Sequence, residues 1–236
     1  MVISTVCEAL RKRKVRLPGL LLGLALACSP ALHAAPMAYK GGIMFMGEYS
    51  ADDVEFGANY AVTARDAFGA MFAKQTGSTG LRRSTQHATY TRLAKRWNLP
   101  AAQANIWLMG NVEQVRGDGL KGSVTAWEPG FQVDYETTRI YAAVNWHSQR
   151  AAGANDALVR HNATALRGGF SFYNAEYDEV QPWLIVQAKR ETGWTRERSI
   201  TPMLRFIHKA YFLELGVKRD LNERTNSAQV NLMLVH

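Results

Sequence analysis

An alternation of apolar and polar side chains, with a period of two residues, recurs from about residue 42 to the end of the chain. In the segment VEFGANYAV (54–62), Val54 and Phe56 stand on either side of Glu55, and AYFLELGVK (210–218) repeats the pattern. Successive side chains of a β-strand point to opposite faces, so a period of two predicts strands with one apolar and one more polar face. This pattern limits the chain to an all-β fold.

Counting segments of this kind predicts twelve strands. They lie at roughly 42–49, 54–62, 67–75, 88–97, 103–115, 123–134, 139–148, 162–173, 180–190, 199–208, 210–218 and 227–236. The fifth segment also carries helix-start signals, with Asn98 as a helix-capping residue and Pro100 in a first turn. We favour a strand there because Ile106 and Leu108 continue the alternation.

The connections between these strands are expected to alternate in length. The second, fourth, sixth, eighth and tenth are short, for example 63–66 and 135–138, whereas most of the others are longer and more polar, for example 149–161. Long loops at one end and tight turns at the other are typical of transmembrane barrels, whose short turns are periplasmic. Aromatic residues near the short turns could form an interfacial girdle: Tyr60, Phe68, Trp97, Tyr135, Tyr141, Tyr173, Tyr177 and Tyr211.

The first 35 residues have the pattern of a cleavable signal peptide. A basic segment, RKRKVR (11–16), precedes an apolar run, and small residues allow cleavage after Ala34 or Ala35. A lipoprotein signal with Cys28 as the lipidated residue is an alternative, but the leucine usual three positions before the cysteine is missing. We therefore expect Sec-type export and one domain over residues 36–236.

Removal of this segment changes what the composition implies. Both cysteines, Cys7 and Cys28, lie within it, so the mature chain holds neither a disulfide nor a thiolate metal site. The net charge of +8 falls to +4, because five basic residues and one acidic residue are lost. The basic surplus is therefore weak evidence for nucleic-acid binding, and we expect no nucleic-acid partner.

Together, a signal peptide, a cysteine-free mature chain, alternating strands and an apolar-patterned final strand resemble a Gram-negative outer-membrane β-barrel. The resemblance covers residues 36–236 and implies a closed antiparallel transmembrane barrel, with outer-membrane lipid and the barrel-assembly machinery as partners. His236 departs from the terminal Phe or Trp usual in such proteins. The segments VDYETT (133–138) and FSFYNAEYDEVQPWL (170–184) resemble a small, uncharacterised proteobacterial family.

In such a barrel the charged residues of the strands should face the lumen, because Arg or Lys at the lipid midplane costs about 2–4 kcal/mol. The residues expected to line the lumen are Glu55, Arg92, Glu128, Arg139, Arg167, Arg205 and Glu214. Two interpretations are open. The charges form a bracing network, or they line a narrow passive channel for a small polar solute.

The segment GGIMFMG (41–47) places two methionines, Met44 and Met46, on the inward face of the first strand. Thioethers favour copper(I). Two ligands are too few for a metal site, and methionine is a common filler of gaps in cores. We expect packing here, with no metal and no cofactor.

Two alternatives to a non-enzymatic membrane barrel stay open. A lipid-acting hydrolase or acyltransferase could use Ser148 with His147 or His161, since such enzymes need a serine and a histidine on the same side. His147 and Ser148 are adjacent, so they point to opposite faces of one strand. We therefore commit to no catalytic residue. The other alternative is a soluble periplasmic β-barrel that binds a small ligand.

Overall fold

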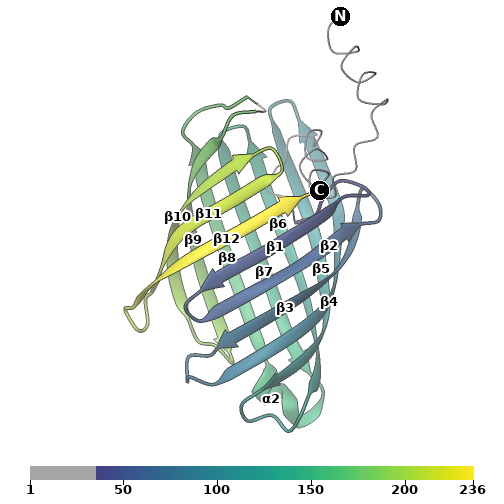
Figure 1. The fold of residues 1–236 in the computed structure, drawn as a ribbon, viewed down its shortest axis with the longest axis vertical. Coiled ribbons are helices and arrows are strands. Elements are labelled where there is room, and N and C mark those ends of the chain that lie inside the picture. Colours follow the sequence, from purple (N-terminus) through teal and green to yellow (C-terminus); the bar gives the residue numbers. More distant parts are fainter. Residues whose placement is uncertain (1–35, 177) are drawn as a thin grey trace, which may run out of the picture. The chain divides into compact units, whose positions relative to one another are not determined.

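Twelve antiparallel strands form one closed barrel in the computed structural model, which describes residues 36–176 and 178–236 (Figure 1). The strands are β1 (Ile43–Ser50), β2 (Asp53–Ala61), β3 (Asp66–Thr76), β4 (Arg82–Leu99), β5 (Ala102–Gly117), β6 (Val124–Thr137), β7 (Ile140–Ala151), β8 (His161–Ser171), β9 (Gln181–Gly193), β10 (Arg198–His208), β11 (Tyr211–Asp220) and β12 (Asn226–Val235). The predicted fold and strand number are confirmed. The expected signal peptide lies outside the described residues.

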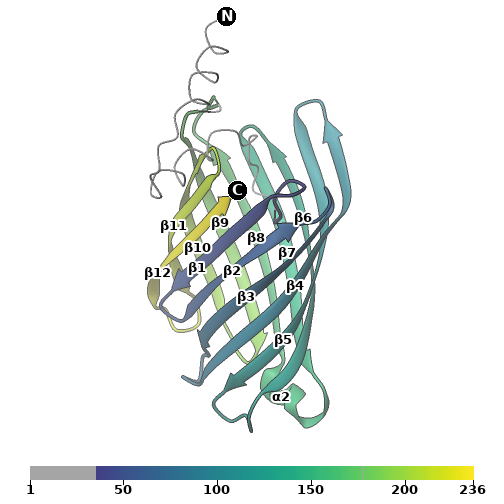
Figure 2. The same ribbon diagram turned by 45° about the vertical axis from the view of Figure 1, so that its right-hand side comes forward.

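Each strand pairs with its neighbours in sequence, and β1 pairs with β12 to close the sheet. The closing register runs from Met44 opposite Val235 to Ser50 opposite Gln229. The strands are strongly tilted relative to the long axis of the barrel, as Figure 2 shows for β1 to β4. Tilt of this kind is required to close a sheet into a barrel. Within the described ranges, no helix is long and apolar enough to cross a membrane.

The two faces of the sheet differ as the alternation predicts. Outward side chains are largely apolar and exposed, such as Phe56 at 58% and Leu232 at 53%. Inward positions hold most of the buried polar and charged side chains. An exposed apolar surface that continues around the barrel far exceeds the patches found on soluble proteins. The outer wall is therefore suited to lipid, which argues against the soluble alternative.

The connections differ in part from the expected layout. Four of the five at the end that holds the C-terminus are short, but the eighth, 172–180, is not. At the other end the loops are shorter than expected because strands continue into them: β4 begins at Arg82 and β7 ends at Ala151. The loop after β7 contains a short 3-10 helix, η2 (Gly153–Asn155), and one helical turn, α2 (Asp156–Val159).

The expected aromatic girdle is present in part. The side chains of Tyr60, Phe68, Trp97, Tyr135, Tyr173 and Tyr211 are all more than 40% exposed. Tyr141 is different, because it points inward and is buried. Tyr177 lies outside the described residues. Of the two helix signals, Asn98 lies near the end of β4, and Pro100 lies in the tight turn between β4 and β5.

Candidate functional site in the barrel interior

Two connected cavities occupy the middle of the barrel. The larger has a volume of about 350 Å³ and the smaller about 230 Å³. Both are lined by Pro36, Met46, Glu48, Met71 and Arg167. Apart from Pro36, their walls come almost entirely from inward positions of the strands, so the alternation that builds the barrel also selects the residues that meet a solute.

An ionic cluster on β8, β10 and β11 borders the smaller cavity. The Nη2 atom of Arg167 donates to Glu214 at 2.6 Å, and the Nε atom of Arg205 donates to the same carboxylate at 2.9 Å. The amide of Asn231 on β12 donates to it at 2.8 Å. Glu214 is almost fully buried, and each of these contacts offsets part of its desolvation cost.

Arg205 is itself fully buried and lies between two aromatic rings. Its guanidinium carbon is 4.6 Å from the ring centre of Tyr141 and 4.7 Å from that of Phe212. A guanidinium over aromatic faces is attracted by their negative charge density. Tyr141 comes from β7, so Arg205 connects the β7 wall to β10 and β11. This part of the charged interior braces the barrel.

Three inward histidines each approach a carboxylate. His147 lies 2.8 Å from Glu128 on the neighbouring strand β6. His87 lies 3.3 Å from Glu113, and His161 lies 3.4 Å from Glu191. The ammonium group of Lys189 also contacts Glu191, at 2.8 Å. The rings of His147 and His161 are 5.9 Å apart. These pairs hold most of the carboxylates on this side of the interior.

Two carboxylates of the cavity walls are not held in this way. Glu48 on β1 and Glu55 on β2 are direct cross-strand partners, and both face inward. Glu48 accepts a hydrogen bond from Gln229 at 3.1 Å. Among the described residues, Glu55 has neither a hydrogen bond nor an ion-pair partner. Carboxylates directly opposite each other repel when both are ionised, so this pair favours an added proton or a bound cation.

At the end that carries α2, an arginine crosses the interior. The Nη1 atom of Arg83 on β4 donates to Gln149 on β7 at 2.9 Å, and its Nε atom donates to Gln75 at 2.8 Å. The indole of Trp194, from the loop between β9 and β10, stacks on the same guanidinium at 4.0 Å. We call Arg83, Gln149 and Trp194 the cross-lumen latch. It narrows this end of the lumen.

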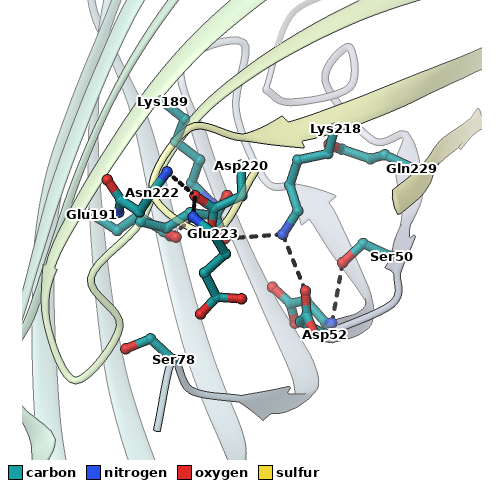
Figure 3. A network of polar contacts seen from close by, with 12 residues as sticks. Ser50, Asp52, Ser78, Lys189, Glu191, Lys218, Asp220, Asn222, Glu223 and Gln229 are labelled. Atoms are coloured by element: carbon teal, nitrogen blue, oxygen red, sulfur yellow. Dashed lines mark hydrogen bonds and ion pairs between the residues drawn. The ribbon is translucent and has the colours of Figure 1, made fainter. Parts of the chain in front are cut away.

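A second set of polar contacts lies beside this latch (Figure 3). The ammonium group of Lys218 contacts Asp52 at 3.4 Å and Glu197 at 3.0 Å. Asp52 belongs to the loop between β1 and β2, and Glu197 to the loop between β9 and β10. The contacts connect two loops across the seam region of the barrel and hold the loop that carries Trp194.

The other end of the lumen is closed by apolar packing. Met37 and Ala38 precede β1 and are buried against Met44, Leu93 and Trp107. The amide of Asn59 contacts the carbonyl oxygen of Pro36 at 3.4 Å inside the barrel. The segment 36–38 therefore enters the lumen and forms an N-terminal plug. Both ends of the cavities are narrowed in this structure.

The structure brings five of the seven expected lumen residues to the inner wall. Glu55, Glu128, Arg167, Arg205 and Glu214 border one or both cavities. They do not meet as one group. Glu128 lies with the histidines, whereas Arg167, Arg205 and Glu214 form the ionic cluster that we call the brace.

The remaining two are placed differently. Arg92 is exposed on the outer wall and pairs with Asp66 at 2.9 Å. Thr91 faces the cavity, so Arg92 faces outward, and a β-bulge between Leu93 and Lys95 then reverses the alternation for the rest of β4. Arg139 lies in the turn before β7 and donates to the carbonyl oxygen of Ser171 at 3.1 Å. It is a turn-holding residue at the barrel edge.

Sequence reasoning missed Arg83, Glu113, Lys189, Glu191 and Asp134. Arg83 and Glu191 lie where loops were expected, so no alternation was assigned to them. Asp134 explains the tryptophan that interrupts the polar face of β5: the indole Nε1 of Trp107 donates to its carboxylate at 2.7 Å. Extension of the alternation by a few residues would have found Arg83 and Glu191. Glu113, Asp134 and Lys189 lie at inward positions within the predicted strands.

The two methionines of β1, Met44 and Met46, lie in different surroundings. Met44 is fully buried in the apolar cluster with the N-terminal plug and Val235. Met46 borders both cavities. No group of three or more His, Cys, Asp or Glu side chains suited to a metal ion occurs among the described residues. Packing accounts for Met44, as a gap-filling residue.

Ser148 does not meet a histidine. Its Oγ donates to Asn162 at 2.8 Å, and both residues are at outward positions of β7 and β8. His147 and His161 face the interior. The sheet separates the proposed nucleophile from each proposed base, so the hydrolase assignment to these residues is wrong.

No protein-family model matches the chain, and comparison with curated proteins by sequence gives no match. Solved structures match along most of the chain. LpxR from Salmonella typhimurium has a TM-score of 0.50 at 5% identity, covering 82% of this chain and 99% of its own. The fold is that of an outer-membrane β-barrel.

Two further barrels match with lower scores. The KdgM porin in complex with oligogalacturonate has a TM-score of 0.47 at 9% identity, covering 82% of this chain and 98% of its own. Outer membrane phospholipase A from Escherichia coli has a TM-score of 0.41 at 12% identity, covering 86% and 94%. At these identities the likeness concerns the fold, and the residues of the interior must be judged by their own chemistry.

Proposed function

We propose that this protein is a narrow channel of the bacterial outer membrane that prefers small cationic solutes. The observation that carries the proposal is the opposed pair Glu48 and Glu55, which faces the cavities without a direct ion-pair partner. Together with Glu128, Glu214 and Glu191, five carboxylates stand against the three cations Arg167, Arg205 and Lys189. A pore lined by excess carboxylate attracts cations and repels anions.

The size of the interior supports a small solute. The larger cavity, about 350 Å³, is at the lower end of the range of small-molecule sites. The brace around Glu214 leaves this space free because its side chains lie against one wall. Passage requires the cross-lumen latch and the N-terminal plug to move, so we expect a low open probability.

The orientation follows from the barrel type. In outer-membrane barrels the short turns are periplasmic and the longer loops are extracellular. The C-terminus and most of the short turns then lie at the periplasmic side. The cross-lumen latch lies at the extracellular side.

Planar-bilayer recordings test the proposal. In a tenfold gradient of potassium chloride, we expect a reversal potential of the sign that indicates selectivity for potassium over chloride. The double variant Glu48→Gln with Glu55→Gln should move it toward zero. The matched control is Arg92→Gln, which removes a charge from the outer wall and should leave selectivity unchanged. Anion selectivity of the wild type contradicts the proposal, and so does a double variant with the same cation selectivity as the wild type.

A second function is a closed, braced barrel without transport. It is favoured by the narrowing at both ends of the lumen. A protein that stays silent in bilayers even after replacement of Trp194 by Ala would support this alternative over a channel.

A further inference from the structure

The outer wall carries an unbalanced set of cations near the extracellular rim. Seven basic side chains occupy outward positions in the last few residues of the strands at this end: Lys74, Arg82, Arg116, Arg150, Arg190, Arg198 and Arg219. Among the described strand residues, no carboxylate faces outward at this end. Arginine and lysine on the lipid side of a barrel are tolerated near an interface and strongly disfavoured at the midplane. Their height therefore marks the level of lipid headgroups.

Within the described residues, these cations lack ion-pair partners. Arg150 donates to the carbonyl oxygen of Gln149 at 3.2 Å. The other six side chains make no hydrogen bond or ion pair with any described residue. Arg190 and Arg198 are direct cross-strand partners on β9 and β10. Because like charges opposite each other destabilise a sheet, an anion from outside the chain would stabilise this arrangement.

A groove at the same rim gives three of the cations a common site. It has a volume of about 540 Å³, and its walls include Lys74, Arg82 and Arg116, on three successive strands. Thr76 and Ser84 add hydroxyl donors to the same walls. Three carboxylates also border the groove, and each has a partner: Asp118 accepts from the backbone amide of Arg82 at 2.9 Å, Asp52 contacts Lys218 at 3.4 Å, and Asp53 accepts from Gln75 at 3.3 Å. Guanidinium groups with nearby hydroxyls are the donors that bind phosphate oxygens in pairs.

The opposite end of the outer wall provides a contrast. There Arg92 is paired with Asp66 at 2.9 Å, and the phenol of Tyr90 donates to the same carboxylate at 2.8 Å. Among the described strand residues, that end carries two outward cations, Arg92 and Lys95, and Lys95 lies 5.6 Å from the ring centre of Trp97. The cluster of outward cations therefore belongs to one rim.

We propose that the rim cations bind the phosphate groups of the lipopolysaccharide that forms the outer leaflet. Lys74, Arg82 and Arg116 hold one phosphorylated glycolipid headgroup in the groove, and Arg190, Arg198 and Arg219 hold a second on the far wall. The acyl chains then lie along the apolar side chains below, such as Phe72 and Val112. The inference depends on the orientation given above and is independent of any channel activity.

Thermal unfolding of the detergent-extracted full chain tests this inference. The readout is the temperature at which the heat-modifiable band shifts on a gel. Bisphosphorylated lipid A should raise this midpoint by several degrees, and fully dephosphorylated lipid A and inorganic phosphate should not. The triple variant K74Q/R82Q/R116Q should bind bisphosphorylated lipid A at least fivefold more weakly. The control R92Q/K95Q should bind it as the wild type does.

A measurement on the wild type alone covers the case in which the triple variant does not fold. Raising sodium chloride from 0.05 M to 0.5 M should remove most of the stabilisation, because exposed charge pairs are screened. Equal stabilisation by dephosphorylated lipid A, or undiminished stabilisation in high salt, would overturn the proposal. A shift with inorganic phosphate alone would also overturn it, since a free-anion site is then sufficient.

Discussion

Glu48 and Glu55 face each other across the β1–β2 ladder, and both side chains enter the cavity region of the barrel. Two carboxylates at this spacing repel each other unless a proton or a cation lies between them. A fold that keeps both of them retains a repulsive pair at the position where a solute would pass. In the proposed channel, the pair would therefore couple stability to ionic selectivity.

Replacement of Glu55 by Gln is expected to stabilise the barrel by about 0.2–1 kcal/mol, because it relieves a repulsive cross-strand pair. Glu48→Gln should have a similar effect, and the double variant should gain little beyond one single change. The measurement is unfolding by urea in lipid vesicles. Destabilisation by both single variants would show that a bound cation bridges the two carboxylates.

Replacement of Glu214 by Gln is expected to cost about 3–5 kcal/mol, because it leaves two buried guanidinium groups without a carboxylate. The matched control is Asp66→Asn, which breaks the exposed pair with Arg92 and should cost about 0–1 kcal/mol. Urea unfolding of both variants checks the difference. Addition of Arg205→Met to Glu214→Gln should restore part of the loss. An equal, small effect of the two single variants would remove the bracing role.

Trp194→Ala is expected to open the lumen at the end that carries α2, because it removes the ring that covers Arg83. The only cysteines of the chain are at positions 7 and 28, so one added cysteine can report access in a protein that begins at residue 36. With Asn111→Cys in the larger cavity, a water-soluble maleimide should react at least tenfold faster in the Trp194→Ala background. Phe131→Ala, on the outer wall, serves as the control. Unchanged reactivity would show that the latch does not limit access.

The loop after β7 should respond to pH through Asp156. The Arg160 side chain donates to this carboxylate, and so does the amide of Ala151, and together they lower the pKa of Asp156. The stability that ionised Asp156 adds to the loop is present above the pKa that this group has in the unfolded chain. It is lost as pH falls through the lowered pKa of the folded chain. In the Arg160→Gln variant, the midpoint of the Asp156 titration should move to higher pH. Titration of the Ala151 amide resonance in micelles checks it, and identical midpoints would contradict the assignment.

The alternation was sufficient to predict twelve strands and which face of each meets the interior. It failed where the ladder itself is irregular. With Trp97 outward, an uninterrupted alternation places Arg92 inside, and the bulge between Leu93 and Lys95 adds the residue that reverses it. The alternation of residue types along β4 gives no sign of such an inserted residue. The bulge is a property of the pairing with the neighbouring strand, where two residues of β4 stand opposite one.

Partners within the interior were harder to foresee than positions. Arg83 and Gln149 are 66 residues apart and meet only because β4 and β7 curve around the same lumen. The ends of strands were assigned to loops because polar residues there resemble loop composition, and this removed Arg83 and Glu191 from consideration. Pairings across a barrel depend on its closure, which no window of sequence contains.

The β1–β12 seam joins the first and last strands, with Met44 opposite Val235. Loop closure over nearly the whole chain costs entropy that is recovered only after the other ten strands are in place. We therefore expect closure to be the last step of assembly, with two long unpaired edges exposed until then. Open edges are templates for intermolecular pairing, so we expect this chain to require a helper that shields both edges until they meet.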